Sequence, residues 1–259
     1  MVRVSEFDKI FNDAQRQGRI SFYMTSRGEE ACSVGSAAAL EENDWLLPQY
    51  REIGAFFWRG FSFTDVANQL CSNGRDLAHG RQLPLHVGSR KHHALYVKST
   101  LGTQIPHAAG VAFAMKQQRR QQVSIAYFGE GSASEGDVPS GFNIASVHRT
   151  PTIFFCRNNG YAISTGVQDQ YRGDGIAPRG LAYGMTSVRV DGNDLLAVIA
   201  ATRHPPARCR PPPTARRPPP AARLLPAACC LLPVCRLPPV ACRLSPAACR
   251  LPLPTVPPH

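Results

Sequence analysis

Two apolar runs, each followed by a loop of glycine or asparagine, constrain the fold of this chain more than any other feature. Residues 123–128 are apolar and precede GEG at 129–131, and residues 152–156 are apolar and precede NNG at 158–160. A helical pattern over residues 133–148 separates the two runs. Strand, loop and helix alternating at this spacing predict an α/β fold with a doubly wound parallel sheet.

The loops after these two strands are candidates for a binding site. Right-handed crossovers bring both loops to the carboxyl edge of the sheet, where ligands bind in such folds. Glu130 offers a carboxylate, Asn159 an amide oxygen and Tyr161 a backbone carbonyl, and Mg²⁺ prefers such oxygens together with phosphate oxygens. Glycines beside Glu130 allow close approach of a diphosphate. A magnesium–diphosphate site is therefore predicted.

The same loops have two other interpretations. Glycine and asparagine are common turn residues, so a pair of ordinary strand-to-helix turns remains an alternative. A dinucleotide fingerprint needs GxGxxG, whereas residues 129–134 are GEGSAS. The dinucleotide interpretation is therefore rejected.

The rest of the first 203 residues carries further local signals. Apolar spacing predicts a helix over residues 2–17 that ends at Gly18, and residues 62–72 predict another with Ser62 or Thr64 as N-cap. Residues 28–40 and 104–118 are rich in small residues and compatible with helices, and residues 73–94 predict a loop. A third apolar run at 187–190 and a helix from Leu195 extend the alternation.

Composition divides the chain at His204. Residues 204–259 contain 17 of the 23 prolines and 6 of the 9 cysteines, and no Asp, Glu or Gly. Such a segment buries no core, so we expect a domain at 1–203 and a low-complexity, disordered tail at 204–259. The tail repeats Cys-Arg-Leu every seven residues, which is interpreted either as a metal-binding or interaction segment or as a translated nucleotide repeat.

Charge and cysteine content exclude several classes of function. Most of the net charge of +11 comes from the tail, which lacks the aromatic residues that stack on bases, so no nucleic acid partner is expected. Cys32, Cys71 and Cys156 form no CxxC motif, which suits a reducing compartment. No apolar stretch reaches 18 residues, so no membrane span is expected.

Several stretches of the domain, in this order, resemble one enzyme family. The matching stretches are QRQGRISFYMT (15–25), GEE (28–30), VGSAAAL (34–40), QYRE (49–52), GTQIPHAAGVA (102–112), YFGEGSASEGD (127–137), FFCRNNGYAIST (154–165), QYRGDGIAPRG (170–180) and VRVDGND (188–194). They resemble the alpha subunits of the decarboxylating component of branched-chain 2-oxo acid dehydrogenases. The resemblance implies the thiamine diphosphate-binding fold and covers about residues 10–203.

The resemblance assigns roles to individual residues. It implies Mg²⁺ ligation by Glu130, Asn159 and Tyr161. It implies contacts with thiamine diphosphate by Tyr50, Arg51, Ser99, Leu101, Gly131, Ser132, Arg157, Ala162 and Ile163. An arginine suits a diphosphate because its planar fork pairs with two oxygens, although Arg51 alone would also be explained as a surface ion pair.

Two further assignments rest on loops before the sheet. His86 in LPLHVG resembles an active-site histidine that would donate to the substrate, although a loop histidine is often merely solvated. Thr103 and Gln104 match a potassium-binding loop. Lys98 departs from that pattern, since the family has a small hydroxyl residue there and an ammonium group repels a bound cation.

The function implied is oxidative decarboxylation of branched-chain 2-oxo acids with thiamine diphosphate and Mg²⁺, and acyl transfer to a lipoyl group. The implied partners are a dehydrogenase beta subunit in an α2β2 assembly, a lipoyl acyltransferase core and the 2-oxo acid, in the mitochondrial matrix. Because the resemblance ends near Thr202, a truncated or wrongly predicted gene product without activity is one alternative. Pyruvate or acetoin as substrate is another.

Overall fold

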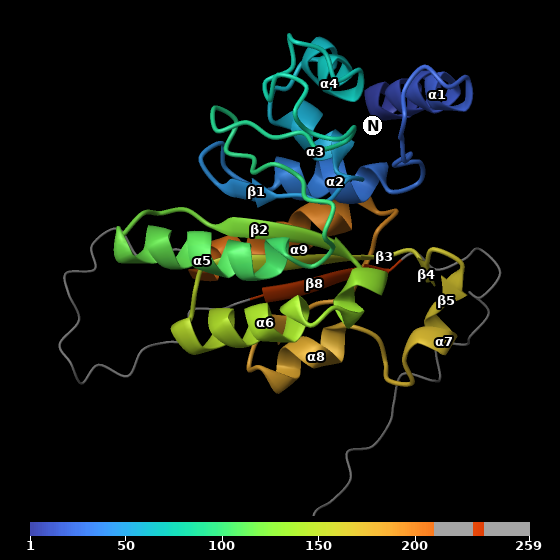
Figure 1. Ribbon diagram of the computed structural model, residues 1–259. Helices are drawn as coiled ribbons and strands as arrows, with labels where there is room; N and C mark the ends of the chain where they lie inside the picture. The colour runs from blue at the N-terminus through green and yellow to red at the C-terminus, as the bar shows by residue number, and fades with distance from the viewer. Residues whose placement is uncertain (210–229, 236–259) are drawn as a thin grey trace, which may run out of the picture.

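A parallel sheet lies at the centre of the molecule, in a computed structural model that describes residues 1–209 and 230–235 (Figure 1). Strands β1 (Trp45–Leu47), β2 (Ser124–Gly129) and β3 (Thr152–Asn158) pair in parallel in that order. Gly129 lies opposite Arg157, so β2 and β3 end at the same edge. The predicted α/β fold with a parallel sheet is confirmed.

The sheet continues beyond β3 with residues from the second half of the chain. Strand β8 (Cys230–Cys235) pairs with β3, and the two-residue strands β6 (Thr186–Ser187) and β7 (Val190–Asp191) both pair with β8. The sequence predicts one strand over 187–190, whereas the structure has two short strands there because the chain pairs with β8 at two separate points.

Some residues of the segment 204–259, which the sequence predicts to be a disordered tail, lie in a helix and a strand of the structure. Helix α9 (Leu195–Cys209) continues past His204, and residues 230–235 form β8. An exposed sheet edge presents unpaired backbone N–H and C=O groups, which is why an extended segment pairs beside β3. The remaining residues of the segment, including the Cys-Arg-Leu repeats at 242 and 249, lie outside the described residues.

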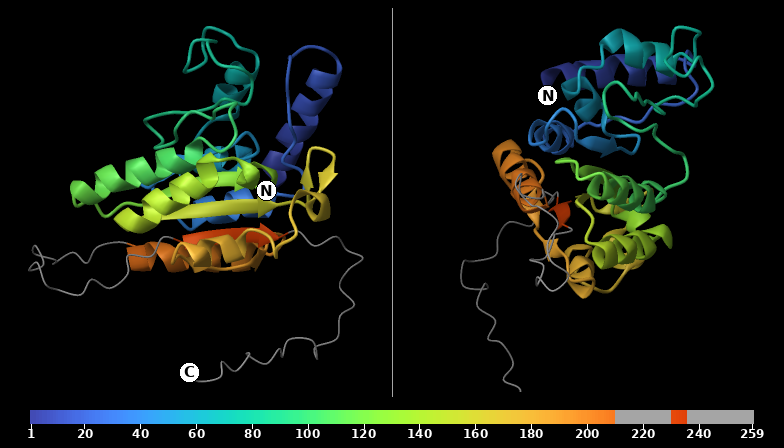
Figure 2. Two further views of the ribbon diagram at one scale, coloured as in Figure 1. Left: turned by 60° about the horizontal axis from the view of Figure 1, so that its bottom comes forward. Right: turned by 90° about the vertical axis from the view of Figure 1, so that its left-hand side faces the viewer.

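Helices cover both faces of the sheet (Figure 2). Alternate side chains of β2 and β3 point to opposite faces, as the two-residue period of a strand requires. One face packs against α2 (Glu30–Ala38) and α9, and buries Ile125, Tyr127, Ile153 and Phe155. The other packs against α5 (Gln104–Gln117) and α6 (Asp137–His148), and buries Ala126, Phe128, Phe154 and Cys156.

Helices α5 and α6 run side by side, and a glycine sets their spacing (Figure 2). A Cβ added to Gly141 would lie 2.7 Å from Cγ2 of Ile105 and 2.9 Å from the backbone nitrogen of Pro106. Any side chain at this position would therefore force the helices apart. The small residues predicted to form a helix over 104–118 serve the same close packing.

The N-terminal part of the chain packs over the first face. It comprises α1 (Val2–Arg16), α3 (Ile53–Trp58) and α4 (Phe63–Leu70). Ser62 is the N-cap of α4, since its hydroxyl accepts the Asp65 N–H at 3.0 Å and the Asp65 carboxylate accepts the Ser62 N–H at 2.9 Å. Of the two predicted caps, Ser62 is confirmed and Thr64 is not the cap.

Shorter elements complete the domain around the strand ends. A 3-10 helix η1 (Gly131–Ser134) follows β2, the hairpin strands β4 (Tyr161–Ala162) and β5 (Thr165–Gly166) follow β3, and α7 (Val167–Gln170) and α8 (Ala177–Ala182) come next. Among residues 1–209 and 230–235, no helix has the length and apolar character needed to cross a bilayer.

Candidate functional site

The GEG and NNG loops meet at the carboxyl edge of the sheet. The Glu130 N–H donates to the Arg157 carbonyl at 3.0 Å, which joins the end of β2 to the end of β3. A Cβ on Gly131 would lie 2.7 Å from Cβ of Ala162, so a glycine is needed for η1 to approach the β4 strand. The predicted proximity of the two loops is therefore a feature of the structure.

The Glu130 carboxyl group lies at this edge in a buried position, with 1% of the residue exposed. Gln170 on α7 donates its amide N–H to Oε1 of Glu130 at 3.1 Å. Burial raises the pKa of Glu130 above its ordinary value, although the Gln170 hydrogen bond acts in the opposite direction. A buried carboxylate of this kind is stabilised by a cation beside it.

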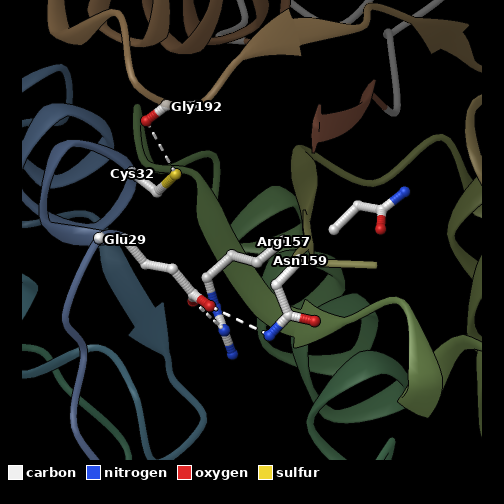
Figure 3. Close-up of a pocket in the computed structure, with 7 residues that line it drawn as sticks. Glu29, Cys32, Arg157, Asn159 and Gly192 are labelled. Atoms are coloured by element: carbon white, nitrogen blue, oxygen red, sulfur yellow. Dashed lines mark hydrogen bonds and ion pairs between the residues drawn. The ribbon is translucent and has the colours of Figure 1, made fainter. Parts of the chain in front are cut away.

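Arg157, at the end of β3, lies at the centre of a buried ionic network (Figure 3). Its Nη1 is 2.6 Å from Oε2 of Glu29, and its Nε pairs with Oε1 of Glu52. Its Nη2 donates to Oε1 of Gln49 at 3.3 Å. These contacts fix the plane of the guanidinium from three sides, because its N–H donors form a rigid fork.

The charges of this network act on one another through a buried environment. Burial alone would lower the pKa of Arg157, but the charges of Glu52 and Glu29 outweigh it and raise that pKa. Burial would raise the pKa of Glu29, but the charge and hydrogen bond of Arg157 hold it below its ordinary value. For Glu52, which is fully buried, burial prevails over Arg157 and the pKa is raised.

Asn159 extends the network toward the loop. Its Nδ2 donates to Oε1 of Glu29 at 3.1 Å (Figure 3). Its Oδ1 accepts the Tyr161 N–H at 3.2 Å. The next residues are open to solvent: Tyr161 is exposed, Ala162 is half-buried and Ile163 is fully exposed with φ +58°. This exposed segment is the part of the edge that a ligand would cover.

The QYRE segment (49–52) presents two residues inward and two outward. Gln49 accepts the Gly129 N–H at 2.9 Å through Oε1 and donates its own backbone N–H to Glu52 at 2.7 Å. Tyr50 and Arg51 are half-buried, with the guanidinium carbon 5.6 Å from the Tyr50 ring centroid. Nη1 of Arg51 donates to the Thr25 carbonyl at 2.5 Å. Arg51 thus anchors a neighbouring loop and forms no ion pair with Glu52.

His86 and Ser99, predicted separately, are in contact. The His86 ring lies 2.9 Å from the Pro84 carbonyl through Nδ1 and 2.6 Å from the Ser99 hydroxyl through Nε2. A carbonyl only accepts, so in the neutral ring Nδ1 carries the proton and Nε2 accepts from Ser99. His86 is therefore a buried, hydrogen-bonded residue, and the interpretation of a merely solvated loop histidine is wrong.

The segment after Ser99 leads into helix α5. Leu101 is half-buried, and a Cβ on Gly102 would lie 3.1 Å from Cβ of Glu135, which places this segment beside η1. The Thr103 hydroxyl donates to the Thr100 carbonyl at 3.0 Å, and Gln104 donates its amide to the Tyr127 carbonyl at 2.7 Å. Ser132, which is buried, donates its hydroxyl to the Gly129 carbonyl at 2.8 Å.

Sequence reasoning assigned no role to Glu29, Gln49, Glu52 and Gln170, although all four bond to predicted site residues. Glu29 and Glu52 each stand directly before a helix of small or apolar residues. A carboxylate in such a setting is buried only with a partner. That signal alone did not identify Arg157 as the partner.

The described residues contain no cluster of three His, Cys, Asp or Glu side chains that would hold a metal by themselves. The oxygens predicted as metal ligands are instead the Glu130 carboxylate, the Asn159 amide and a backbone carbonyl, and the nearby carboxylates of Glu29 and Glu52 are paired with Arg157. This donor set fits a hard cation such as Mg²⁺ when phosphate oxygens complete its shell. The buried Glu130 carboxylate suits a metal bound to a diphosphate.

Comparison with known proteins identifies the family. The family model described as "Dehydrogenase E1 component" matches residues 1–212. The chain belongs to the dehydrogenase E1 component family. Within this E1 family it is similar to proteins named 2-oxoisovalerate dehydrogenase subunit alpha, mitochondrial. The identity is 54% over 204 residues with the protein of Dictyostelium discoideum, covering 78% of this chain and 46% of that protein.

Animal relatives in the E1 family give similar values. The identity is 53% over 204 residues with the subunit of Caenorhabditis elegans, covering 78% of this chain and 47% of the relative. The identity is 52% over 208 residues with the subunit of Bos taurus, covering 80% of this chain and 46% of the relative. The chain therefore spans about half the length of the curated relatives that it matches.

Proposed function

We propose that this chain binds thiamine diphosphate and Mg²⁺ as the alpha subunit of an E1 enzyme that oxidatively decarboxylates branched-chain 2-oxo acids. The observation that carries the proposal is the meeting of Glu130, Asn159 and Arg157 at one sheet edge, in loops with the family's motifs. Membership of the E1 family supports thiamine diphosphate as the cofactor. The names of the related proteins support the substrate class and a mitochondrial location.

The Mg²⁺ ligands in this proposal are the Glu130 carboxylate, the Asn159 amide oxygen and the Tyr161 carbonyl. The diphosphate and its surroundings are contacted by Tyr50, Arg51, Ser99, Leu101, Gly131, Ser132, Arg157, Ala162 and Ile163. Thr103 and Gln104 are proposed for potassium. Gln104 already donates its amide N–H to Tyr127. Only its Oε1 would therefore face a cation.

Charge explains why the metal and the diphosphate would bind together. When all are ionised, Arg51 and Arg157 contribute +2 and Glu29, Glu52 and Glu130 contribute −3, a sum of −1. A diphosphate approaching this edge alone meets a net negative charge. A divalent cation beside Glu130 reverses the sign, and the interaction is strong because the groups are buried.

Thiamine diphosphate, when bound, would supply a carbon nucleophile and an electron sink for decarboxylation of the 2-oxo acid. This chain's residues hold and orient it, as proteins do for such cofactors. His86 is proposed to donate a proton or hydrogen bond to the substrate through Nε2, which requires the doubly protonated ring, because Nδ1–H is already held by the Pro84 carbonyl. The proposed partners are a dehydrogenase beta subunit in an α2β2 assembly and a lipoyl acyltransferase core that receives the acyl group.

Binding to the full 259-residue chain tests the first half of the proposal. Thiamine diphosphate is titrated with and without Mg²⁺, and bound cofactor is followed by calorimetry. Binding is expected with Mg²⁺ and is expected to disappear with EDTA. Glu130→Gln should lose the Mg²⁺-dependent binding, whereas Glu135→Gln, which alters an exposed carboxylate five residues away, should retain it. Metal-independent binding would contradict the proposed site.

Turnover tests the second half. The chain is mixed with a beta subunit, Mg²⁺, thiamine diphosphate and a lipoyl acceptor. Carbon dioxide is measured from 3-methyl-2-oxobutanoate and from pyruvate, and acetaldehyde is measured from acetoin, in parallel. The branched-chain acid is expected to react fastest. Cofactor binding without any turnover would identify the chain as an inactive fragment, and a preference for pyruvate or acetoin would contradict the proposed substrate class.

A further inference from the structure

One carboxylate links two of the proposed ligand residues. Glu29 precedes helix α2 and is 8% exposed. Its Oε2 is 2.6 Å from Nη1 of Arg157, and its Oε1 accepts the Asn159 amide N–H at 3.1 Å. The carboxylate therefore bridges the end of β3 and the following loop, from a segment more than 120 residues earlier (Figure 3).

The bridge determines which end of the Asn159 amide faces the loop. Nδ2 is committed to Glu29, and Oδ1 is held on the other side by the Tyr161 N–H at 3.2 Å. Turning the amide over would bring its oxygen against the Glu29 carboxylate and its NH₂ against the Tyr161 N–H. Both contacts would be unfavourable, because two acceptors or two donors would face each other. Glu29 thus selects the orientation in which the amide oxygen is available to a cation.

The same carboxylate orients Arg157, but it is not the only group that compensates the buried charge. Glu52 pairs with Nε of the guanidinium on its other side. Loss of the Glu29 charge would leave Arg157 with one ionic partner, so the fold should survive. The direction of the guanidinium fork and of the Asn159 amide would no longer be fixed.

We infer that Glu29 is a positioning residue that orients the Asn159 amide and the Arg157 guanidinium for a magnesium-bound diphosphate. This inference rests on the proposed function. Residues behind metal ligands typically contribute a factor of about 10–100 to metal affinity, because they fix the ligand's orientation and basicity. Glu29 occupies that place for two ligand residues at once.

The test uses the full chain with Glu29→Gln. A glutamine at this position presents one oxygen and one NH₂, so it satisfies Arg157 or Asn159 but not both. We expect unchanged far-UV circular dichroism and a Mg²⁺ affinity about 10–100-fold weaker at saturating thiamine diphosphate. Glu30→Gln is the matched control, because the Glu30 carboxylate accepts the Gly28 N–H at 2.7 Å at the start of the same helix.

A second variant covers the possibility that Glu29→Gln does not fold. Glu29→Asp retains the charge and withdraws it from the loop by one methylene, so it should weaken Mg²⁺ binding while keeping the buried charge compensated. A Mg²⁺ affinity equal to that of the wild type in a folded Glu29→Gln or Glu29→Asp chain would overturn this inference but not the proposed function. Absence of Mg²⁺-dependent cofactor binding by the unaltered chain would overturn the proposed function and this inference together.

Discussion

Replacing Arg157 by methionine tests the energetics of the buried network. The change removes the one cation between Glu29 and Glu52 while keeping a side chain of similar length. Arg157 is 4% exposed, so two carboxylates would be left in a place that water barely reaches. Breaking a buried ion pair by removing one partner costs about 3–5 kcal/mol.

The expected loss can be measured by thermal unfolding of the full chain, followed by circular dichroism. A domain of about 200 residues loses about 2–4 °C of melting temperature per kcal/mol. The melting temperature of Arg157→Met should therefore fall by about 6–20 °C. Adding Glu52→Gln to Arg157→Met should restore part of the loss, because it removes one of the unpaired buried charges.

An exposed ion pair in the same chain provides the control. Arg189 pairs with Asp174 at 2.9 Å, with 45% and 76% of the two side chains exposed. Exposed pairs contribute at most about 1 kcal/mol, so Arg189→Met should change the unfolding midpoint little. If Arg157→Met lost no more stability than Arg189→Met, the reasoning about the buried network would be refuted.

Three further measurements address other parts of the molecule. Ser62→Ala should cost about 1 kcal/mol in urea unfolding through loss of the α4 cap, whereas Thr64→Ala should cost less than about 0.5 kcal/mol. The hydrogen bonds from Ser62 hold the pKa of Asp65 below its ordinary value. Their stabilisation is therefore present at neutral pH and is lost as the pH falls through that lowered pKa. An equal loss of unfolding free energy in Ser62→Ala at neutral and at strongly acidic pH would contradict this. Tyr127→Phe should cost about 1 kcal/mol, since the Tyr127 hydroxyl lies 3.0 Å from the Ser36 hydroxyl in the core, and an unchanged midpoint would show that this bond is dispensable.

The sequence predicted the parallel sheet and the long helices because their apolar patterns are local and regular. It did not predict α3 (Ile53–Trp58), because six consecutive small and apolar residues have no clear period. It did not predict the β4–β5 hairpin either, because two-residue strands carry almost no sequence signal. Strand β8 was missed because a proline-rich segment gives no strand pattern, and its pairing depends on the free edge of β3.

For the site, the motifs indicated which residues come together at the strand ends but not how they are held. Glu130 and Asn159 follow predicted strands, so topology alone placed them at one edge. Glu29 and Glu52 directly precede helices α2 and α3, Gln170 ends α7, and their contacts arise from tertiary packing. No periodic pattern in the sequence encodes those contacts.

The bridging contacts of Glu29 also bear on how the chain folds. They join residues 128 and 130 positions apart, whereas α2 and β3 each form from neighbouring residues. Closing so long a loop costs conformational entropy before any contact offsets it, so such pairings form late. During synthesis Glu29 leaves the ribosome well before β3 and stays hydrated until that strand is complete. Formation of the Glu29 contacts therefore reports that α2 and the end of β3 have come together.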